Sequence, residues 1–298
     1  MFQVLANSAI YACEIGIIAL GISLSYSILK FANFAHIQFA VIGAYFTYFA
    51  AEILGLSIFV STAVSLILTG AIAVVVDYFV FRQLREASSE SKMIASWGVA
   101  LLLRSIIAAI FGGSARVLSV KLTPYQWAGA LFTSLDVIVV ATTILAMILL
   151  HQTLNRTRLG TALRALSSNF DLAETRGIPS ERIIKLMWFL SGSYAALGGT
   201  LLAIESQIRP TTDLSILLPV FASVTIGGFG NVFGAVAGAI ILALAQNVLI
   251  SIDFGAIFFS EPWFLPSQQR DFIAVAALVL MLLLRPHGMA GLPNIENK

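Results

Sequence analysis

Few side chains in this sequence have the types and spacing that catalysis requires. The three histidines, His36, His151 and His287, lack the short spacing that places two metal ligands on one helix, and no His-Glu-x-x-His stretch occurs. The absence of any Gly-Lys dipeptide excludes the Walker A loop that binds the phosphates of ATP. Ser193 stands among glycines but has no histidine at a matching depth to activate it. We therefore expect this chain to be no enzyme and to hold no metal or cofactor of its own.

Polar residues interrupt the apolar runs of the sequence at two places. The stretch NFAHIQ, residues 33–38, puts three polar side chains at the boundary of the first two runs, and TIGGFGNVFG, residues 225–234, breaks a later run with four glycines and an asparagine. Polar groups at membrane depth are tolerated where protein or a water-filled cavity surrounds them. Interrupted segments in both halves of a membrane protein indicate a translocation path. The residues expected to line this path are Asn33, Phe34, His36, Gln38, Gly227, Gly228, Gly230 and Asn231.

Both stretches also have a packing interpretation. Gly230, Gly234 and Gly238 follow the small-xxx-small spacing that lets helix backbones approach closely, and packing explains the glycines better than pathway lining does. For Asn33, His36 and Asn231, packing and pathway lining explain the residue types equally well.

Charged residues within apolar runs are functional candidates because a charge inside a membrane is costly. Glu52, Asp77 and Glu205 lie near enough to the ends of their runs to reach the membrane surface. Glu14 and Arg104 do not, so they remain candidates. The shortage of such charges fits the passage of an apolar molecule.

The composition places the chain among polytopic membrane proteins. Of its 298 residues, 59% are hydrophobic and 11% are charged, and the mean hydropathy is +0.94. The net charge of +2 and the lack of a basic stripe interleaved with aromatics argue against nucleic-acid binding. Because about 20 apolar residues cross a bilayer as a helix, we expect a single all-α transmembrane domain, residues 1–298, with about eight or nine hydrophobic helices. The expected spans are 9–29, 34–54, 56–81, 93–112, 135–151, 183–204, 214–228, 232–252 and 268–284.

The distribution of lysine and arginine predicts which way the chain sits in the membrane. Twelve basic residues fall in one set of alternate connections and four in the other, and short loops that stay in the cytoplasm carry the excess. We therefore expect an outside N-terminus, a cytoplasmic C-terminus, and a pair of segments at 214–252 that either crosses fully or is re-entrant. The twelve are Lys30, Arg82, Arg85, Lys92, Arg156, Arg158, Arg164, Arg176, Arg182, Lys185, Arg285 and Lys298; the four are Arg116, Lys121, Arg209 and Arg270.

The longest polar stretch, about 153–182, falls on the cytoplasmic side of this arrangement. It carries one apolar stripe with helical spacing, formed by Leu159, Leu163, Leu166, Phe170 and Ala173, on one helix or on two short helices in tandem. Ser168 with Asp171 resembles a capping box, and Gly177 followed by Pro179 predicts a helix stop. The stretch is either an amphipathic helix at the lipid interface or a docking surface for a soluble partner.

Four stretches resemble the permease subunits of bacterial ABC importers for branched-chain and other neutral amino acids. They are Asn33-Phe34-Ala35-His36; Arg158-x-Gly160-x-Ala162-x-Arg164-Ala165 with Ala173 and Gly177-Ile178; Gly227-Gly228-Phe229-Gly230-Asn231-Val232-Phe233-Gly234-Ala235; and Arg285-Pro286-x-Gly288. They occur in the family's order over nearly the whole chain. Ile37 departs from the family's usual glycine and makes a very close backbone approach there less expected.

The resemblance implies a heteromeric importer in the bacterial inner membrane. This chain would pair with a second, similar permease, with two cytoplasmic ATPases that bind ATP and magnesium, and with an external solute-binding protein, while membrane lipid surrounds it. The polar stretch would be a coupling segment that fits a cleft on an ATPase. Its coupling residues would be Arg158, Gly160, Arg164, Phe170, Ala173, Arg176 and Gly177.

Two other functions remain open at this point. Permeases for urea and short amides resemble the same family, so the substrate is less certain than the mechanism. A self-sufficient secondary carrier or channel belongs to a different class, and transport by this chain alone would distinguish it from a subunit.

Overall fold

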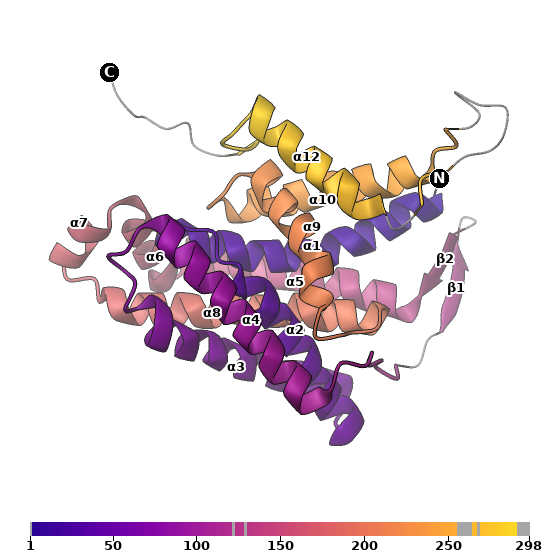
Figure 1. The fold of residues 1–298 in the computed structure, drawn as a ribbon, viewed down its shortest axis with the longest axis horizontal. Helices are drawn as coiled ribbons and strands as arrows, with labels where there is room; N and C mark the ends of the chain where they lie inside the picture. Colours follow the sequence, from indigo (N-terminus) through magenta and orange to yellow (C-terminus); the bar gives the residue numbers. More distant parts are fainter. Residues whose placement is uncertain (1, 121–122, 128–129, 255–263, 267–268, 291–298) are drawn as a thin grey trace.

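The computed structural model describes residues 2–120, 123–127, 130–254, 264–266 and 269–290, and this part of the chain is almost entirely helical (Figure 1). Each of the nine expected spans coincides with a helix, so the polytopic all-α prediction is confirmed. The elements are α1 (Phe2–Leu29), α2 (Ala35–Tyr48), the π-helix η1 (Phe49–Ile53), α3 (Ile58–Val76), the π-helix η2 (Asp77–Phe81), α4 (Ser89–Phe111), β1 (Pro124–Trp127), β2 (Ala130–Thr133), α5 (Ser134–Arg156), α6 (Arg158–Ser168), α7 (Phe170–Thr175), α8 (Ser180–Glu205), α9 (Thr212–Gly227), α10 (Val232–Ser251) and α12 (Arg270–Leu284).

Helices α1 and α8 form the centre of the bundle. In an apolar 18-residue stretch of each of these helices, 78% of the residues are buried inside the protein. The corresponding share is 28% in α3 with η2, 28% in α4 and 22% in α5. The outer helices therefore turn apolar side chains away from the protein, as helices that face lipid do. The central helices approach their neighbours closely through small residues: a Cβ on Gly199 of α8 would lie 1.8 Å from the carbonyl oxygen of Ala40 in α2.

The connections between helices gather at two opposite ends of the bundle (Figure 1). At one end, which we call the basic end, Ser167 of α6 donates a hydrogen bond to the Ser27 carbonyl (2.7 Å) and Ser89 donates to the Lys30 carbonyl (3.4 Å). At the other, the hairpin end, the backbones of Arg116 and Ile208 pair, as a bridge between two loops. The grouping reproduces the alternation of loops expected from the basic residues.

Helices α9 and α10 form a pair joined by a short turn. Their connecting turn lies at the basic end, where Phe229 packs on Tyr26 with ring centroids 4.7 Å apart. The far part of α10 lies at the hairpin end, where Asn247 accepts a hydrogen bond from Arg270 (3.0 Å) and that guanidinium lies over Tyr11. The connecting turn therefore lies near the end of α1, while α9, at 16 residues, is shorter than the helices long enough to cross a membrane.

A short antiparallel hairpin, β1–β2, was not expected from the sequence. Its strands pair Pro124 with Thr133 and Tyr125 with Phe132. The first helix holds the hairpin, because Gln3 of α1 exchanges two hydrogen bonds with the backbone of Leu131. Strands of four residues are too short for hydrophobic alternation to identify.

Candidate functional site

The turn at Asn33, which joins α1 to α2, is held inside the bundle by contacts with other helices. Asn33 is 1% exposed, and its side-chain oxygen accepts a hydrogen bond from the Ala35 amide (3.1 Å). The Phe34 amide donates to Ser96 of α4 (3.1 Å), and the Phe34 ring packs against Phe221 of α9 with centroids 4.9 Å apart. The turn therefore joins α1, α2, α4 and α9.

His36 links three helices through one hydroxyl group. Its Nδ1 lies 3.1 Å from Oγ of Ser191 in α8, and the same hydroxyl donates to the Gly21 carbonyl of α1 (3.0 Å). Since a hydroxyl has one proton, the imidazole Nδ1 is the donor to Ser191. A Cβ on Gly21 would lie 2.6 Å from the imidazole ring, so glycine is required beside it. These contacts hold His36 between α1 and α8, while its buried Nε2 has no partner in the described part of the chain.

Gln38 is the one predicted pathway residue whose side-chain amide has neither hydrogen-bonding atom paired in the described structure. It is fully buried, and neither its nitrogen nor its oxygen has a protein partner. It lies one helical turn after Phe34, on the side of α2 that carries Phe34 against Trp97 and Tyr45 against Phe111, both of α4. An unpaired buried polar group costs about 1–3 kcal/mol. In this arrangement the hydrogen-bonding capacity of the Gln38 amide is therefore unmet by the described protein.

A buried ion pair lies between α4 and α9. Arg104 donates to Asp213 from Nε (3.2 Å) and from Nη2, and the side chains are 17% and 6% exposed. Arg104 was a candidate from the sequence, whereas its partner was not. Asp213 stands in the first turn of α9, where a carboxylate also meets the positive end of the helix dipole. The pair fixes the start of α9 at the hairpin end.

The glycine-rich turn after α9 is a tightly built connection. Gly228 and Gly230 have φ values of 100° and 82°, which favour glycine. A Cβ on Gly227 would lie 2.1 Å from the carbonyl oxygen of Gly234, so the start of α10 packs directly on the end of α9. Asn231 caps α10 by accepting a hydrogen bond from the Gly234 amide (2.8 Å), and its amide donates to the Ala290 carbonyl (3.1 Å).

The two groups of predicted pathway residues do not form one continuous surface in this structure. Asn33, His36 and Gln38 are buried between helices, whereas Gly230 and Asn231 line a cavity at the basic end. Phe34, against Phe221 of α9, is the contact between the Asn33 turn and α9.

The polar stretch forms two short helices, α6 and α7, at the basic end (Figure 1). Gly160 packs against the end of α5, since a Cβ there would lie 2.0 Å from the Leu154 carbonyl oxygen, and the Arg164 guanidinium donates to the same oxygen. Gly177 has a φ of 83° and ends the segment, as the sequence predicts. The capping box at Ser168 was wrong: Asn169 caps α7 by accepting from the Leu172 amide (3.0 Å).

The apolar stripe of this segment faces the protein, not outward. Leu163, Leu166 and Ala173 are 3%, 2% and 5% exposed, and Phe170 packs beside the same core. The expectation that Phe170 and Ala173 enter an ATPase groove is therefore wrong for this conformation, because the chain's own helices cover them. The outer surface of the segment consists of exposed residues, with Leu172 as its large apolar side chain at 54% exposure: Arg158, Arg164, Asp171, Leu172, Glu174, Thr175, Arg176 and Gly177.

A charged network ties this segment to α3 and α8. Ser180, which begins α8, donates to Glu174 of α7 (2.7 Å). The next residue, Glu181, pairs with Arg85, and Arg85 lies 3.8 Å from the Asp77 carboxylate of η2. Asp77 is 1% exposed, so protein covers it although it lies near the end of its span. The network links the end of α3 to the start of α8.

These features define a class: a helical membrane permease with a tightly packed centre and a capped, largely polar segment fixed to one end. Within that class, the chain belongs to the family of branched-chain amino acid transport system permease components, whose model matches residues 4–285.

Relatives and a solved structure agree with this family. The chain is 28% identical to a probable branched-chain amino acid transport permease protein LivH of Methanocaldococcus jannaschii, over 97% of this chain and 92% of the relative. It is 26% identical to the high-affinity branched-chain amino acid transport system permease protein BraD of Pseudomonas aeruginosa, over 99% and 97%. The fold is similar to that of PsaBC from Streptococcus pneumoniae in complex with Fab, with a TM-score of 0.51 and 16% identity over 96% of this chain and 94% of that one.

Proposed function

We propose that this chain is the membrane permease subunit of an ATP-driven importer that carries branched-chain amino acids into the cytoplasm. The observation that carries the mechanism is the α6–α7 segment, whose inner stripe is packed on the bundle while its outer face is left uncovered. The family and its relatives support the substrate class.

The basic end is the cytoplasmic end in this proposal. It carries the excess of basic residues, and such residues are retained in the cytoplasm. The N-terminus of α1 then lies outside, and α12 ends on the cytoplasmic side of the inner membrane. An external solute-binding protein delivers the substrate at the hairpin end.

One of the two ATPase subunits binds at the outer face of α6 and α7. ATP and magnesium are held by those partners, since this chain has no loop for phosphate binding. Movement of an ATPase is passed from Glu174 to Ser180, and from Glu181 through Arg85 to Asp77 at the end of α3. The caps and the buried stripe keep the segment rigid, so that the movement is not lost in a flexible loop.

A second, similar permease completes the route through the membrane. Asn33, Phe34, His36 and Gln38 lie beside this route at the α1–α2 turn, and Gly227, Gly228, Gly230 and Asn231 shape its cytoplasmic end. Gln38 offers the unpaired hydrogen-bonding groups that a solute meets when the helices move apart.

The substrate is tested by competition in proteoliposomes that hold the complete importer. Uptake of labelled leucine is measured with an excess of unlabelled isoleucine, urea or acetamide. The proposal expects isoleucine to abolish the signal and the two amides to leave it unchanged. Inhibition by urea, with urea uptake in the same vesicles, would instead assign the chain to the urea and amide permeases.

A further inference from the structure

A cavity of about 700 Å³ opens at the basic end between four parts of the chain. Its walls are the end of α1, the α5–α6 junction, the turn before α10, and the segment that follows α12. This volume is ordinary for a small-molecule site. The proposed function places Gly230 and Asn231 of this lining at the cytoplasmic end of the substrate route and assigns no other ligand to the cavity.

The polar lining of this cavity suits an anion. Lys30 and Arg164 bring two cationic side chains and His287 an imidazole, and no carboxylate is among the described residues that line it. Arg164 is held in place by the carbonyl of Leu154. Lys30 has no carboxylate within ion-pair distance in the described structure, and partial burial lowers the pKa of its amine.

The start of α10 adds to the same wall. Val232 and Phe233 line the cavity as the first two residues of this helix. The first amides of a helix have no partner within it, and the helix dipole is positive there. Backbone donors and cationic side chains together are the usual surroundings of a bound phosphate.

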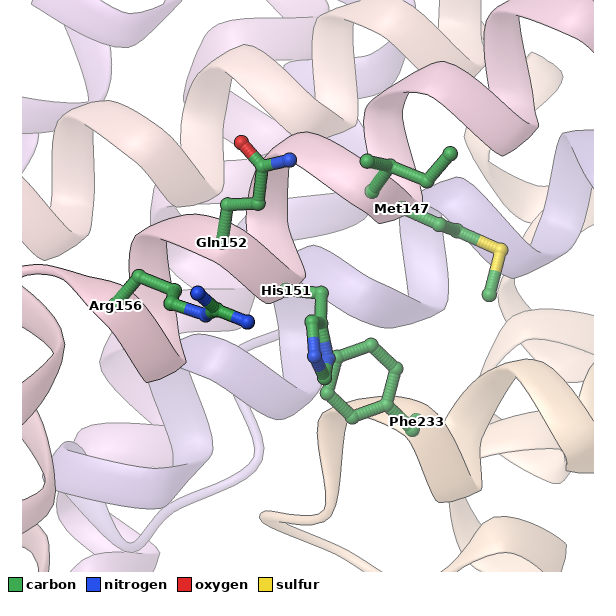
Figure 2. Close-up of a pocket in the computed structure, with 6 residues that line it drawn as sticks. Met147, His151, Gln152, Arg156 and Phe233 are labelled. Atoms are coloured by element: carbon green, nitrogen blue, oxygen red, sulfur yellow. The ribbon is translucent and has the colours of Figure 1, made fainter.

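A groove with a mixed lining of three apolar and three polar side chains adjoins the cavity on the outside of the bundle. A second hollow of about 700 Å³, lined by Met147, Ile148, His151, Gln152, Arg156 and Phe233, lies between α5 and α10. Figure 2 shows the ring of Phe233 against His151, with the Arg156 guanidinium extended toward them. Phe233 lines both hollows. Ile148, 48% exposed, lies two turns inside the end of α5 and extends the groove to membrane depth.

We propose that this cavity binds the phosphate headgroup of an anionic phospholipid, with an acyl chain lying along α5 and α10 past Phe233. A molecule with a phosphate at one end and a hydrocarbon chain at the other matches the basic cavity together with the apolar side chains of the groove, Met147, Ile148 and Phe233. Basic pockets between membrane helices bind such headgroups. The lipid would come from the cytoplasmic leaflet, and only this part of the inference rests on the proposed orientation.

The test measures lipid binding by the purified full-length chain and needs no transport. The delipidated protein in detergent is titrated with phosphatidylglycerol, phosphatidylcholine or inorganic phosphate, and bound lipid is counted by native mass spectrometry. We expect phosphatidylglycerol to bind at least about tenfold more tightly than phosphatidylcholine, whose phosphate carries the same charge but whose choline cation is repelled by Lys30 and Arg164. Equal binding of the two lipids would overturn the proposal.

Matched variants locate the site. Lys30→Gln should weaken phosphatidylglycerol binding about tenfold. Lys185→Gln, which removes the same charge from an exposed position outside the cavity, should leave it unchanged. An equal effect of both variants would show a general attraction to the basic end and contradict the site. A shared unfolding temperature for the three proteins confirms that they are folded.

Inorganic phosphate distinguishes the source of the anion. If millimolar phosphate displaces phosphatidylglycerol from the wild-type chain but the lipid's chain length has no effect on affinity, the site takes a soluble phosphate compound and the lipid assignment is wrong. We expect the reverse: little displacement by phosphate, and weaker binding as the acyl chains are shortened. This outcome does not depend on whether the importer carries amino acids.

Discussion

Arg85 donates a hydrogen bond to Glu181 and so joins the connection after η2 to the first turn of α8. The same guanidinium faces the buried Asp77, so one arginine serves two carboxylates of very different exposure. The pairs of Arg85 with Asp77 and with Glu181 should therefore contribute unequally to stability, and this difference can be measured.

Arg85→Gln should destabilise the protein far more than Glu181→Gln. Loss of the arginine leaves Asp77 buried without a counter-charge, which costs about 3 kcal/mol, whereas the partly exposed Glu181 pair is worth under about 1 kcal/mol. Thermal unfolding of the detergent-solubilised protein measures both. Adding Asp77→Asn to Arg85→Gln should recover most of the loss, and a double variant as unstable as the sum of the single ones would disprove the pairing.

Exchanging the charges of Arg104 and Asp213 should restore only part of the stability that is lost when Arg104 alone is replaced. Arg104→Gln leaves a carboxylate of 6% exposure unpaired and should cost about 3 kcal/mol. The exchanged pair, Arg104→Asp with Asp213→Arg, should recover only part of this, because an arginine in the first turn of α9 opposes the helix dipole by about 0.3–1 kcal/mol. Full recovery in an unfolding experiment would show that the dipole has no role here.

Leu172→Asp should prevent ATPase binding at α7 while the permease remains folded. The side chain is 54% exposed on α7, so a charge there does not disturb the bundle, but it would be buried in an apolar contact with the partner. We expect normal insertion, with loss of ATPase co-purification or of hydrolysis stimulated by the loaded binding protein.

Ala173→Asp is the contrasting variant on the same helix. Because Ala173 is buried against the chain itself, a carboxylate there should lower the unfolding temperature of the isolated permease. A stable Ala173→Asp protein with a normal unfolding temperature would show that the stripe leaves the bundle and faces a partner after all.

Single cysteines test the orientation of the two ends. In a Cys13→Ala background, we expect Ser88→Cys and Ser168→Cys at the basic end to be shielded from an impermeant thiol reagent in intact cells. Ser119→Cys at the hairpin end should be labelled. All three positions are exposed, so burial does not explain a lack of labelling. Labelling of Ser168→Cys from outside would reverse the orientation and remove the coupling role of α6 and α7.

The sequence predicts the helices well because each span is long, apolar and bounded by polar residues. The stop at Gly177 is also predictable, since a glycine that can adopt a left-handed conformation, followed closely by Pro179, is typical of a helix C-terminus. The stripe through Leu163, Leu166 and Ala173 shows that one face of the segment is apolar, but it contains no information on what covers that face. This is why the sequence does not show that the bundle itself covers Ala173.

Contacts between distant residues lie beyond a single sequence. Arg104 and Asp213 are 109 positions apart, and neither has a pattern that names the other. The role of His36 likewise depends on Gly21 and Ser191, which come together only when α1, α2 and α8 pack. The position of Asp77 near the end of its span likewise does not show that η2 turns it toward Arg85.

The most direct test of the proposed function is ATP-dependent uptake of labelled leucine by proteoliposomes of defined composition. Three kinds of vesicle are prepared. The first holds this chain alone, the second holds both permeases and the ATPases, and the third is the second with the external binding protein added. The proposed function predicts uptake only in the complete set and only with ATP inside the compartment that the basic end faces. Uptake of leucine by this chain alone, without ATP, would contradict it and identify a self-sufficient carrier or channel.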